Sequence, residues 1–262
     1  MNQIKLLLIA LQFYTRIPVI GRLALWSDYS SARLSISTRY FTLVGIIIGA
    51  ICSASYWLAH LFFPDAIAVV ISVAVGILMT GAFHEDGWAD FCDAFGGYNS
   101  RTRTLEIMTD SRIGSYGAIG LVLLMLLKVV SLNSMTPLAT VAALLIMHPL
   151  SRAFAVLIMA SMPYAKLNDE SKAKPIAQGL AGKDLAIAMA IALISSGLVL
   201  AYSIERGEFN TTNAVIAGIL MSFGWWRLRN LMKARLQGYT GDALGATQQL
   251  TECLGYVGLA SL

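Results

Sequence analysis

Long apolar runs separated by short polar segments recur along the whole chain. Their lengths suit helices that cross about 30 Å of hydrocarbon, and the alternation typical of membrane β-strands is absent. Two weaker runs, at 4–20 and 250–262, flank the stronger ones. The pattern predicts an all-α polytopic integral membrane protein, with 1–262 as a single domain of about six to eight transmembrane helices. The six stronger runs lie at 41–63, 66–83, 116–133, 137–160, 184–204 and 212–226.

Positive charge is distributed unevenly between the polar segments. The short turns at 64–65, 134–136 and 205–211 contain one basic residue, Arg206. Four longer segments hold 14 Lys and Arg residues. The positive-inside rule therefore places the longer segments in the cytoplasm. One of them, 161–183, is polar and Lys-rich, and we expect it to be a mobile loop. The four segments are 21–40, 84–115, 161–183 and 227–249.

The composition supports a membrane location. Apolar residues make up 57% of the chain and charged residues 13%, against about 25% charged in soluble domains. The net charge of +4 suits anionic lipid headgroups, so no nucleic-acid partner is predicted. The first weak run contains Lys5 and Arg16 and could be an interfacial or re-entrant helix as readily as a span. Small residues at 45–50 could pack helices closely, within the chain or between copies.

Acidic residues gather at the end of the second strong run. No proline interrupts 66–94, so one helix is expected to continue past the membrane surface. At about 100° per residue, Asp86, Asp90 and Asp93 fall within an arc of about 60° on one helix face. Glu85 points about 100° away from this face. The sequence thus predicts a stripe of three carboxylates at a membrane boundary.

Carboxylates on one face repel each other, and a bound cation relieves that repulsion. Oxygen ligands without nearby cysteine or paired histidine favour a hard ion, Mg²⁺ or Mn²⁺. Mg²⁺ in turn usually works through substrate phosphates. The predicted metal ligands are Asp86, Asp90 and Asp93, with Glu85 and Asp110 as further candidates. The alternative is that these acids form an ordinary solvated helix end.

The segment before the span at 116–133 could complete such a site. Asp110 is placed to face the metal, although Asp110 or Ser111 could instead be the N-cap of the next helix. Arg112 offers a planar fork of donors for a phosphate group.

A glycine-rich turn at 238–245 is a second segment of this kind. Gly241 and Gly245 are candidates for seating a phosphate where a helix begins. Asp242 between them is a candidate metal ligand or general base. A cap and turn would explain the same residues without a ligand.

Ionisable residues also lie inside predicted spans. Such groups usually face a cavity or a partner because charge is costly in hydrocarbon. Arg152 is therefore a candidate substrate-binding residue, whereas His148 more often has a structural role. Lys128 lies close enough to a span end to reach the interface with its ammonium group, and no role is assigned to it.

Several motifs together resemble one enzyme family. HEDGWADFCDAFGG at 84–97 and RTRTLEIMTDSRIGSYGAIGLVL at 101–123 are similar to the signature region of cobalamin synthase, adenosylcobinamide-GDP ribazoletransferase. The similarity extends to FYTRIPV, RYFTLVG, HPLSRA and GYTGDALGATQQLTE, in the order of the family and over nearly the full chain. In the connecting spans and in 161–183, the similarity to the family is limited to the apolar or polar character of the segment.

The resemblance implies a substrate and a reaction. Members of this family are integral inner-membrane enzymes of the last stage of adenosylcobalamin assembly. They join adenosylcobinamide-GDP to α-ribazole or its 5′-phosphate, release GMP and require Mg²⁺. The expected catalytic residues are Asp86, Asp90, Asp242 and Arg112, with Arg152 and the two glycines at 241 and 245 as substrate contacts.

Two other functions remain as alternatives. The acidic motif is also similar to that of CDP-alcohol phosphotransferases, but Asp90 stands where their arginine would follow the alanine. A divalent-cation transporter is less favoured, because transport sites usually lie near the midplane between broken helices. A homo-oligomer, or a complex with other cobalamin-assembly enzymes, is compatible with the sequence.

Overall fold

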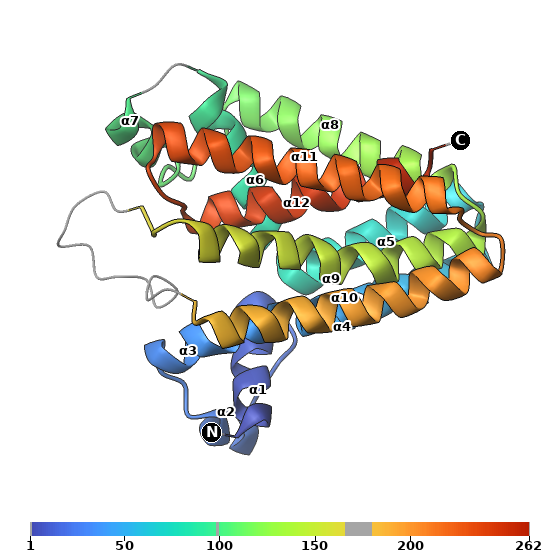
Figure 1. Ribbon diagram of the computed structural model, residues 1–262, viewed down its shortest axis with the longest axis horizontal. Helices are drawn as coiled ribbons and strands as arrows, with labels where there is room; N and C mark the ends of the chain where they lie inside the picture. The colour runs from blue at the N-terminus through green and yellow to red at the C-terminus, as the bar shows by residue number, and fades with distance from the viewer. Residues whose placement is uncertain (1, 98–99, 166–179, 262) are drawn as a thin grey trace.

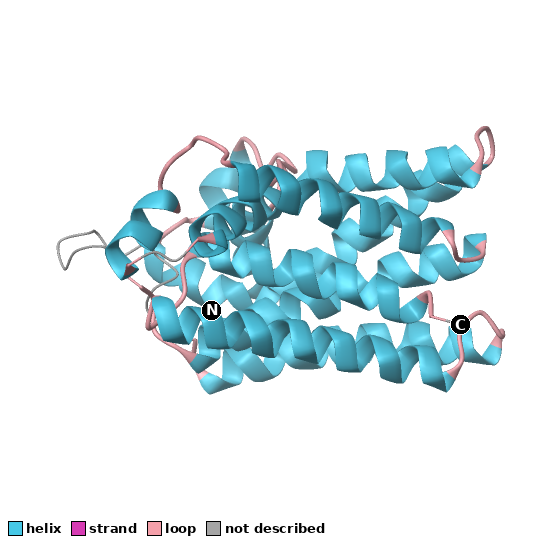
Figure 2. Cartoon of the chain, turned by 90° about the horizontal axis from the view of Figure 1, so that it is seen from above, coloured by secondary structure: helices cyan, strands magenta, loops and turns pink. Residues whose placement is uncertain are grey.

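The protein is a bundle of long helices in the computed structural model, which describes residues 2–97, 100–165 and 180–261 (Figures 1 and 2). Apart from one bridge between Tyr164 and Tyr239, the regular elements of these residues are helical, as predicted. In chain order they are α1 (Gln3–Tyr14), α2 (Arg22–Ser27), α3 (Ser31–Ser37), η1 (Thr38–Tyr40), α4 (Phe41–His60), α5 (Asp65–Thr80), α6 (Phe83–Gly96), α7 (Arg101–Ile107), α8 (Ser115–Asn133), α9 (Pro137–Ser161), α10 (Gly182–Glu205), α11 (Thr211–Arg235) and α12 (Gly241–Leu259).

The long helices run back and forth between two ends of the bundle. The short connections α4–α5, α8–α9 and α10–α11 lie at the right end of Figure 1. Helices α2, α3 and α7 and the link from α11 to α12 lie at the other end. The described parts of the four longer polar segments therefore gather at one end, as the charge distribution predicted. Residues 166–179 of the expected mobile loop lie outside the described residues.

Each strong apolar run forms a helix, but fewer helices than expected meet the criteria for a span. Among the described residues, four helices are long and apolar enough: Ser31–His60, which joins α3, η1 and α4, and then α8, α9 and α10. The pair α5 and α6 qualifies only when taken together, which gives up to five. The sequence had suggested six to eight. Helices α11 and α12 lie alongside the others in Figure 1. Their polar residues lower their mean hydropathy, and they are not among these candidate spans.

The expected continuous helix over 66–94 is wrong. The chain turns by 90° between α5 and α6. Gly81 adopts a left-handed conformation (φ 68°), and its N–H group donates to the Leu78 carbonyl. The N–H group of Ala82 donates to the Ile77 carbonyl at 2.9 Å. This hydrogen-bonded pattern ends helices at glycine without any proline.

Helix α1 does not span the bundle. Its 12 residues extend about 18 Å, which is shorter than the hydrocarbon layer. It runs across the direction of the long helices in Figure 1 and buries Leu6, Ile9, Ala10 and Tyr14. Of the two possibilities for the run at 4–20, the structure favours a helix at the end of the bundle over a true span.

Glycines permit the closest helix crossings. A Cβ atom on Gly45 would lie 2.7 Å from the His148 carbonyl oxygen, so α4 packs directly on α9. A Cβ on Gly258 of α12 would overlap the Cα atom of Ala217 in α11. The small residues at 45–50 therefore pack helices within this chain, which is one of the two outcomes that the sequence left open.

Candidate active site

Aspartates from three parts of the chain converge at α6. The carboxylates of Asp86, Asp242, Asp93 and Asp110 lie within electrostatic reach of the Asp90 carboxylate. Asp86 is exposed, and the others are partly buried. The break before α6 leaves the predicted stripe intact, because all three of its aspartates lie in this one helix. We call Asp86, Asp90 and Asp242 the aspartate site.

The aspartate site exists because α6 and α12 touch along their backbones. A Cβ atom on Gly87 would lie 2.7 Å from the Asp242 carbonyl oxygen. A Cβ on Gly245 would lie 3.2 Å from the Cα atom of His84. Glycine at both positions lets the start of α12 approach the first two turns of α6. Gly245 therefore faces α6. The sequence had predicted that this residue would contact the substrate.

The first turn of α12 supports Asp242. The Thr240 hydroxyl caps this helix by accepting from the Ala243 N–H group at 3.2 Å. The Ala165 N–H group donates to the Tyr239 carbonyl at 2.8 Å, which ties the residues before α12 to the segment that follows α9. A Cβ on Gly241 would meet open space. The predicted helix start is confirmed, and its positive dipole end can attract an anion.

Asp93 holds another helix in place. Its two carboxylate oxygens accept hydrogen bonds from the N–H groups of Gly114 at 2.7 Å and Gly117 at 2.8 Å. Those groups belong to the first turn of α8, whose N-cap is Gly114. The possibility that Asp110 or Ser111 caps α8 is therefore wrong, because Asp93 caps it from a neighbouring helix.

Replacing Asp93 with Ala is expected to destabilise the protein by about 1–2 kcal/mol, the usual effect of losing a helix cap. Asp93→Asn retains one acceptor oxygen and should cost less. Thermal unfolding in detergent measures both variants. Equal stability of Asp93→Ala and the wild type would contradict the capping role.

Asp110 and Arg112 form an ion pair beside α8. The Arg112 Nη2 atom donates to Asp110 Oδ2 at 2.6 Å, and the Arg112 side chain is 86% exposed. Hydrogen bonds from Arg112 lower the pKa of Asp110 to about 2. The Asp110 carboxylate is thus already paired with Arg112. The exposed Arg112 guanidinium remains accessible to a phosphate from solvent.

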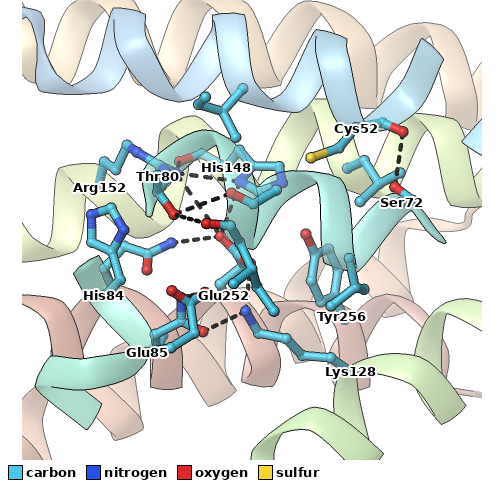
Figure 3. A pocket seen from close by; sticks show the side chains of 17 residues that line it. Cys52, Ser72, Thr80, His84, Glu85, Lys128, His148, Arg152, Glu252 and Tyr256 are labelled. Carbon is cyan, nitrogen blue, oxygen red and sulfur yellow. Dashed lines mark hydrogen bonds and ion pairs between the residues drawn. The ribbon is translucent and has the colours of Figure 1, made fainter. Parts of the chain in front are cut away.

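Glu85 and Arg152 lie in a different place, inside the bundle (Figure 3). The Gln249 Nε2 atom donates to Glu85 Oε1 at 2.8 Å. The Arg152 Nη1 atom donates to the His148 carbonyl oxygen at 2.9 Å and lies 4.0 Å from Glu252. These predicted ligands do not join the aspartates. They belong to what we call the buried polar cluster: Glu85, Lys128, His148, Arg152, Gln248, Gln249 and Glu252.

Lys128 and Glu252 form the centre of the buried polar cluster. The Lys128 Nζ atom lies 2.7 Å from Glu252 Oε1, and each residue is less than 5% exposed. The expectation that Lys128 reaches the interface is wrong, because a buried carboxylate on α12 neutralises its charge. Glu252 was not singled out from the sequence. The available signal was that three cationic or ionisable residues inside spans needed a counter-ion.

A small cavity of about 30 Å³ lies within the buried polar cluster (Figure 3). Several buried atoms that belong to its lining residues have no hydrogen-bond partner in the described chain: Glu85 Oε2, Gln248 Oε1, Arg152 Nε and His84 Nε2. About 10–15 Å³ accommodates one water molecule. The cavity therefore fits water better than a substrate.

The aspartate site fits Mg²⁺ only in part. Within the described residues, no three His, Cys, Asp or Glu side chains stand close enough to hold a metal ion. Protein-bound Mg²⁺ commonly uses one or two carboxylates together with substrate phosphates. Asp86, Asp90 and Asp242 offer oxygen donors of this kind, beside the open space at Gly241. The five-carboxylate ligand set expected from the sequence is not assembled.

These features define a polytopic helical membrane protein with a carboxylate site at one end of its bundle. The chain belongs to the cobalamin-5-phosphate synthase family, whose profile matches residues 6–260. This confirms the family resemblance inferred from the sequence motifs.

Curated relatives match over nearly their whole length. A protein of Shewanella frigidimarina is 41% identical, covering 98% of this chain and 94% of the relative. Relatives from Leptothrix cholodnii and Vibrio parahaemolyticus are each 40% identical over 98% of this chain and cover 95% and 92% of their own lengths. All three carry the name adenosylcobinamide-GDP ribazoletransferase. No solved structure matches the chain.

Proposed function

We propose that this protein is an adenosylcobinamide-GDP ribazoletransferase acting in the final stage of cobalamin synthesis. A ribose hydroxyl of α-ribazole, or of its 5′-phosphate, attacks the cobinamide-side phosphorus of adenosylcobinamide-GDP, and GMP leaves. The carrying observation is the approach of Asp242, at the start of α12, to α6 beside Asp90, in a chain whose family match covers residues 6–260. The reaction needs acids placed in this way beside a phosphate-binding surface.

The aspartate site can remove the proton that the attacking hydroxyl loses. A carboxylate within hydrogen-bond reach of the hydroxyl acts as the general base. Asp86, Asp90 and Asp242 are the candidates, since Asp93 is engaged with α8. Arg112 would bind a phosphate of the donor through its exposed guanidinium.

Two of these aspartates would also hold Mg²⁺ together with the pyrophosphate of the donor. When bound, Mg²⁺ neutralises charge that develops on the phosphate oxygens and on the GMP leaving group. The N-terminus of α12 at Gly241 would face the same anionic groups and add its dipole. The positive-inside rule places this end of the bundle in the cytoplasm, where nucleotide substrates are found.

A substrate comparison tests the proposal. The purified protein in lipid nanodiscs is incubated with α-ribazole and adenosylcobinamide-GDP, with and without Mg²⁺. GMP release that requires α-ribazole and Mg²⁺ is the expected result. Activity with CDP-diacylglycerol and an alcohol instead would support the CDP-alcohol phosphotransferase alternative. Uptake of Mg²⁺ into vesicles without any nucleotide would support the transporter.

A further inference from the structure

A chain of buried hydrogen bonds links the bundle interior to the residue before the aspartate site. Lys128 Nζ donates to Gln249 Oε1 at 2.6 Å. The other end of the same amide, Gln249 Nε2, donates to Glu85 Oε1 at 2.8 Å. Glu85 directly precedes Asp86 in α6. Three helices, α8, α12 and α6, are thereby connected through one amide.

Lys128 determines how the Gln249 amide is oriented. An ammonium group can only donate hydrogen bonds, so it requires the amide oxygen on its side. The amide nitrogen is then directed at Glu85, whose carboxylate can only accept. Gln249 is 2% exposed and Lys128 4% exposed, so water does not compete readily for either group. Charge-assisted hydrogen bonds in such surroundings are strong and directional.

The link acts at the start of α6, whereas the Asp93 carboxylate fixes the later part of this helix against α8. The 90° break at Gly81 and Ala82 separates this first turn from α5, and Ala82, at the N-cap position, makes no capping side-chain hydrogen bond. The crossing with α12 brings the two backbones close at Gly87 and Gly245, neither of which has a side chain. The bond from Gln249 to Glu85 lies in the first turn of α6. It is placed to fix the angle at which Asp86 and Asp90 face Asp242.

We propose that Gln249 is a positioning residue for the aspartate site, with Lys128 orienting its amide and Glu85 as the point of attachment on α6. The inference rests on the proposed function. It assigns Glu85 to holding the helix rather than to binding the metal. A 1 Å displacement of reacting groups can lower turnover by about 100-fold, so a residue that touches no substrate can still control the rate.

A reciprocal exchange separates positioning from metal binding. Gln249→Leu removes the bond and should lower kcat by about 10- to 100-fold. In Glu85→Gln/Gln249→Glu the amide and the carboxylate change places, so the bond re-forms with the opposite donor and Lys128 still finds an acceptor. This double variant should recover most of the wild-type kcat. If Glu85 were a metal ligand, an amide at 85 would not replace it and activity would stay low.

Hydrogen–deuterium exchange provides a readout that does not depend on activity. Gln249→Leu should speed the exchange of amides in 83–96 by about tenfold or more, through local opening. Exchange in α10 should be unchanged, and the double variant should restore α6. The matched control is Ser196→Ala, which removes a buried bond of 3.0 Å from α10 to the Ile146 carbonyl. That control should alter neither kcat nor exchange in α6.

The outcomes are distinct for the two proposals. Wild-type protein that releases no GMP from adenosylcobinamide-GDP would refute the proposed function, while the exchange data would still decide the positioning role. Unchanged exchange in 83–96 for Gln249→Leu, or a double variant no better than Gln249→Leu in an active enzyme, would overturn the positioning role.

Discussion

Replacing Asp90 with Asn is expected to lower kcat by about 10³-fold or more, because a general base contributes about 10²–10⁴ and a charge-stabilising group about 10²–10³. Asn has nearly the same shape, so the helix and its contacts with α12 should persist. The side chain loses its negative charge and can no longer accept a proton from the attacking hydroxyl. Asp86→Asn should behave in the same way. GMP release in nanodiscs measures the effect.

Asp65→Asn is a matched control for these two variants. Asp65 begins α5 at the opposite end of the bundle, where its carboxylate pairs with His60. This substitution removes the same charge without touching the aspartate site, and kcat should stay within about twofold of the wild type. If Asp86→Asn and Asp90→Asn both kept near-normal activity, the aspartate site would be wrongly assigned.

Replacing Glu252 with Ala is expected to have the largest effect on stability, about 3–5 kcal/mol, because it breaks a buried ion pair by removing one partner. Lys128 and Arg152 would then keep their charges inside the bundle without the carboxylate that pairs with them directly. His148 Nδ1, which lies 3.1 Å from Glu252 Oε2, would lose its partner as well. Thermal unfolding of the detergent-solubilised protein measures the loss.

Ser151→Ala serves as the control for Glu252→Ala. The Ser151 hydroxyl also contacts Glu252, at 3.4 Å, but it carries no charge. Its removal should cost about 1 kcal/mol, as for an ordinary hydrogen bond. Similar losses for the two variants would contradict the view that charge compensation holds the buried polar cluster together. A Glu252→Ala protein that fails to accumulate in the membrane would agree with it, provided that Ser151→Ala accumulates normally.

Local periodicity predicted the aspartate stripe well. The spacing of Asp86, Asp90 and Asp93 depends only on their lying in one helix, and α6 contains all three. The absence of proline from 66–94 predicted an unbroken helix. In the structure, a glycine in the left-handed region ends α5 instead. The break changed the direction of the helix but not the relation between its own residues.

The partners of the acids could not be predicted, because they come from distant helices. Asp93 resembled a metal ligand in the sequence, yet Gly114 and Gly117 of α8 occupy both of its oxygens. Glu85 likewise accepts a hydrogen bond from Gln249, which lies 164 positions further along the chain. Periodicity shows which residues share a face, but it does not show which helix covers that face.

Binding of Mn²⁺, followed by electron paramagnetic resonance, tests the central claim most directly. Mn²⁺ suits the same oxygen ligands as Mg²⁺. Since no three-ligand group is preassembled in the described residues, we predict weak binding to the protein alone. Adenosylcobinamide-GDP should tighten that binding strongly, and Asp86→Asn or Asp90→Asn should abolish the increase. Tight Mn²⁺ binding that needs no substrate and survives both substitutions would contradict the account.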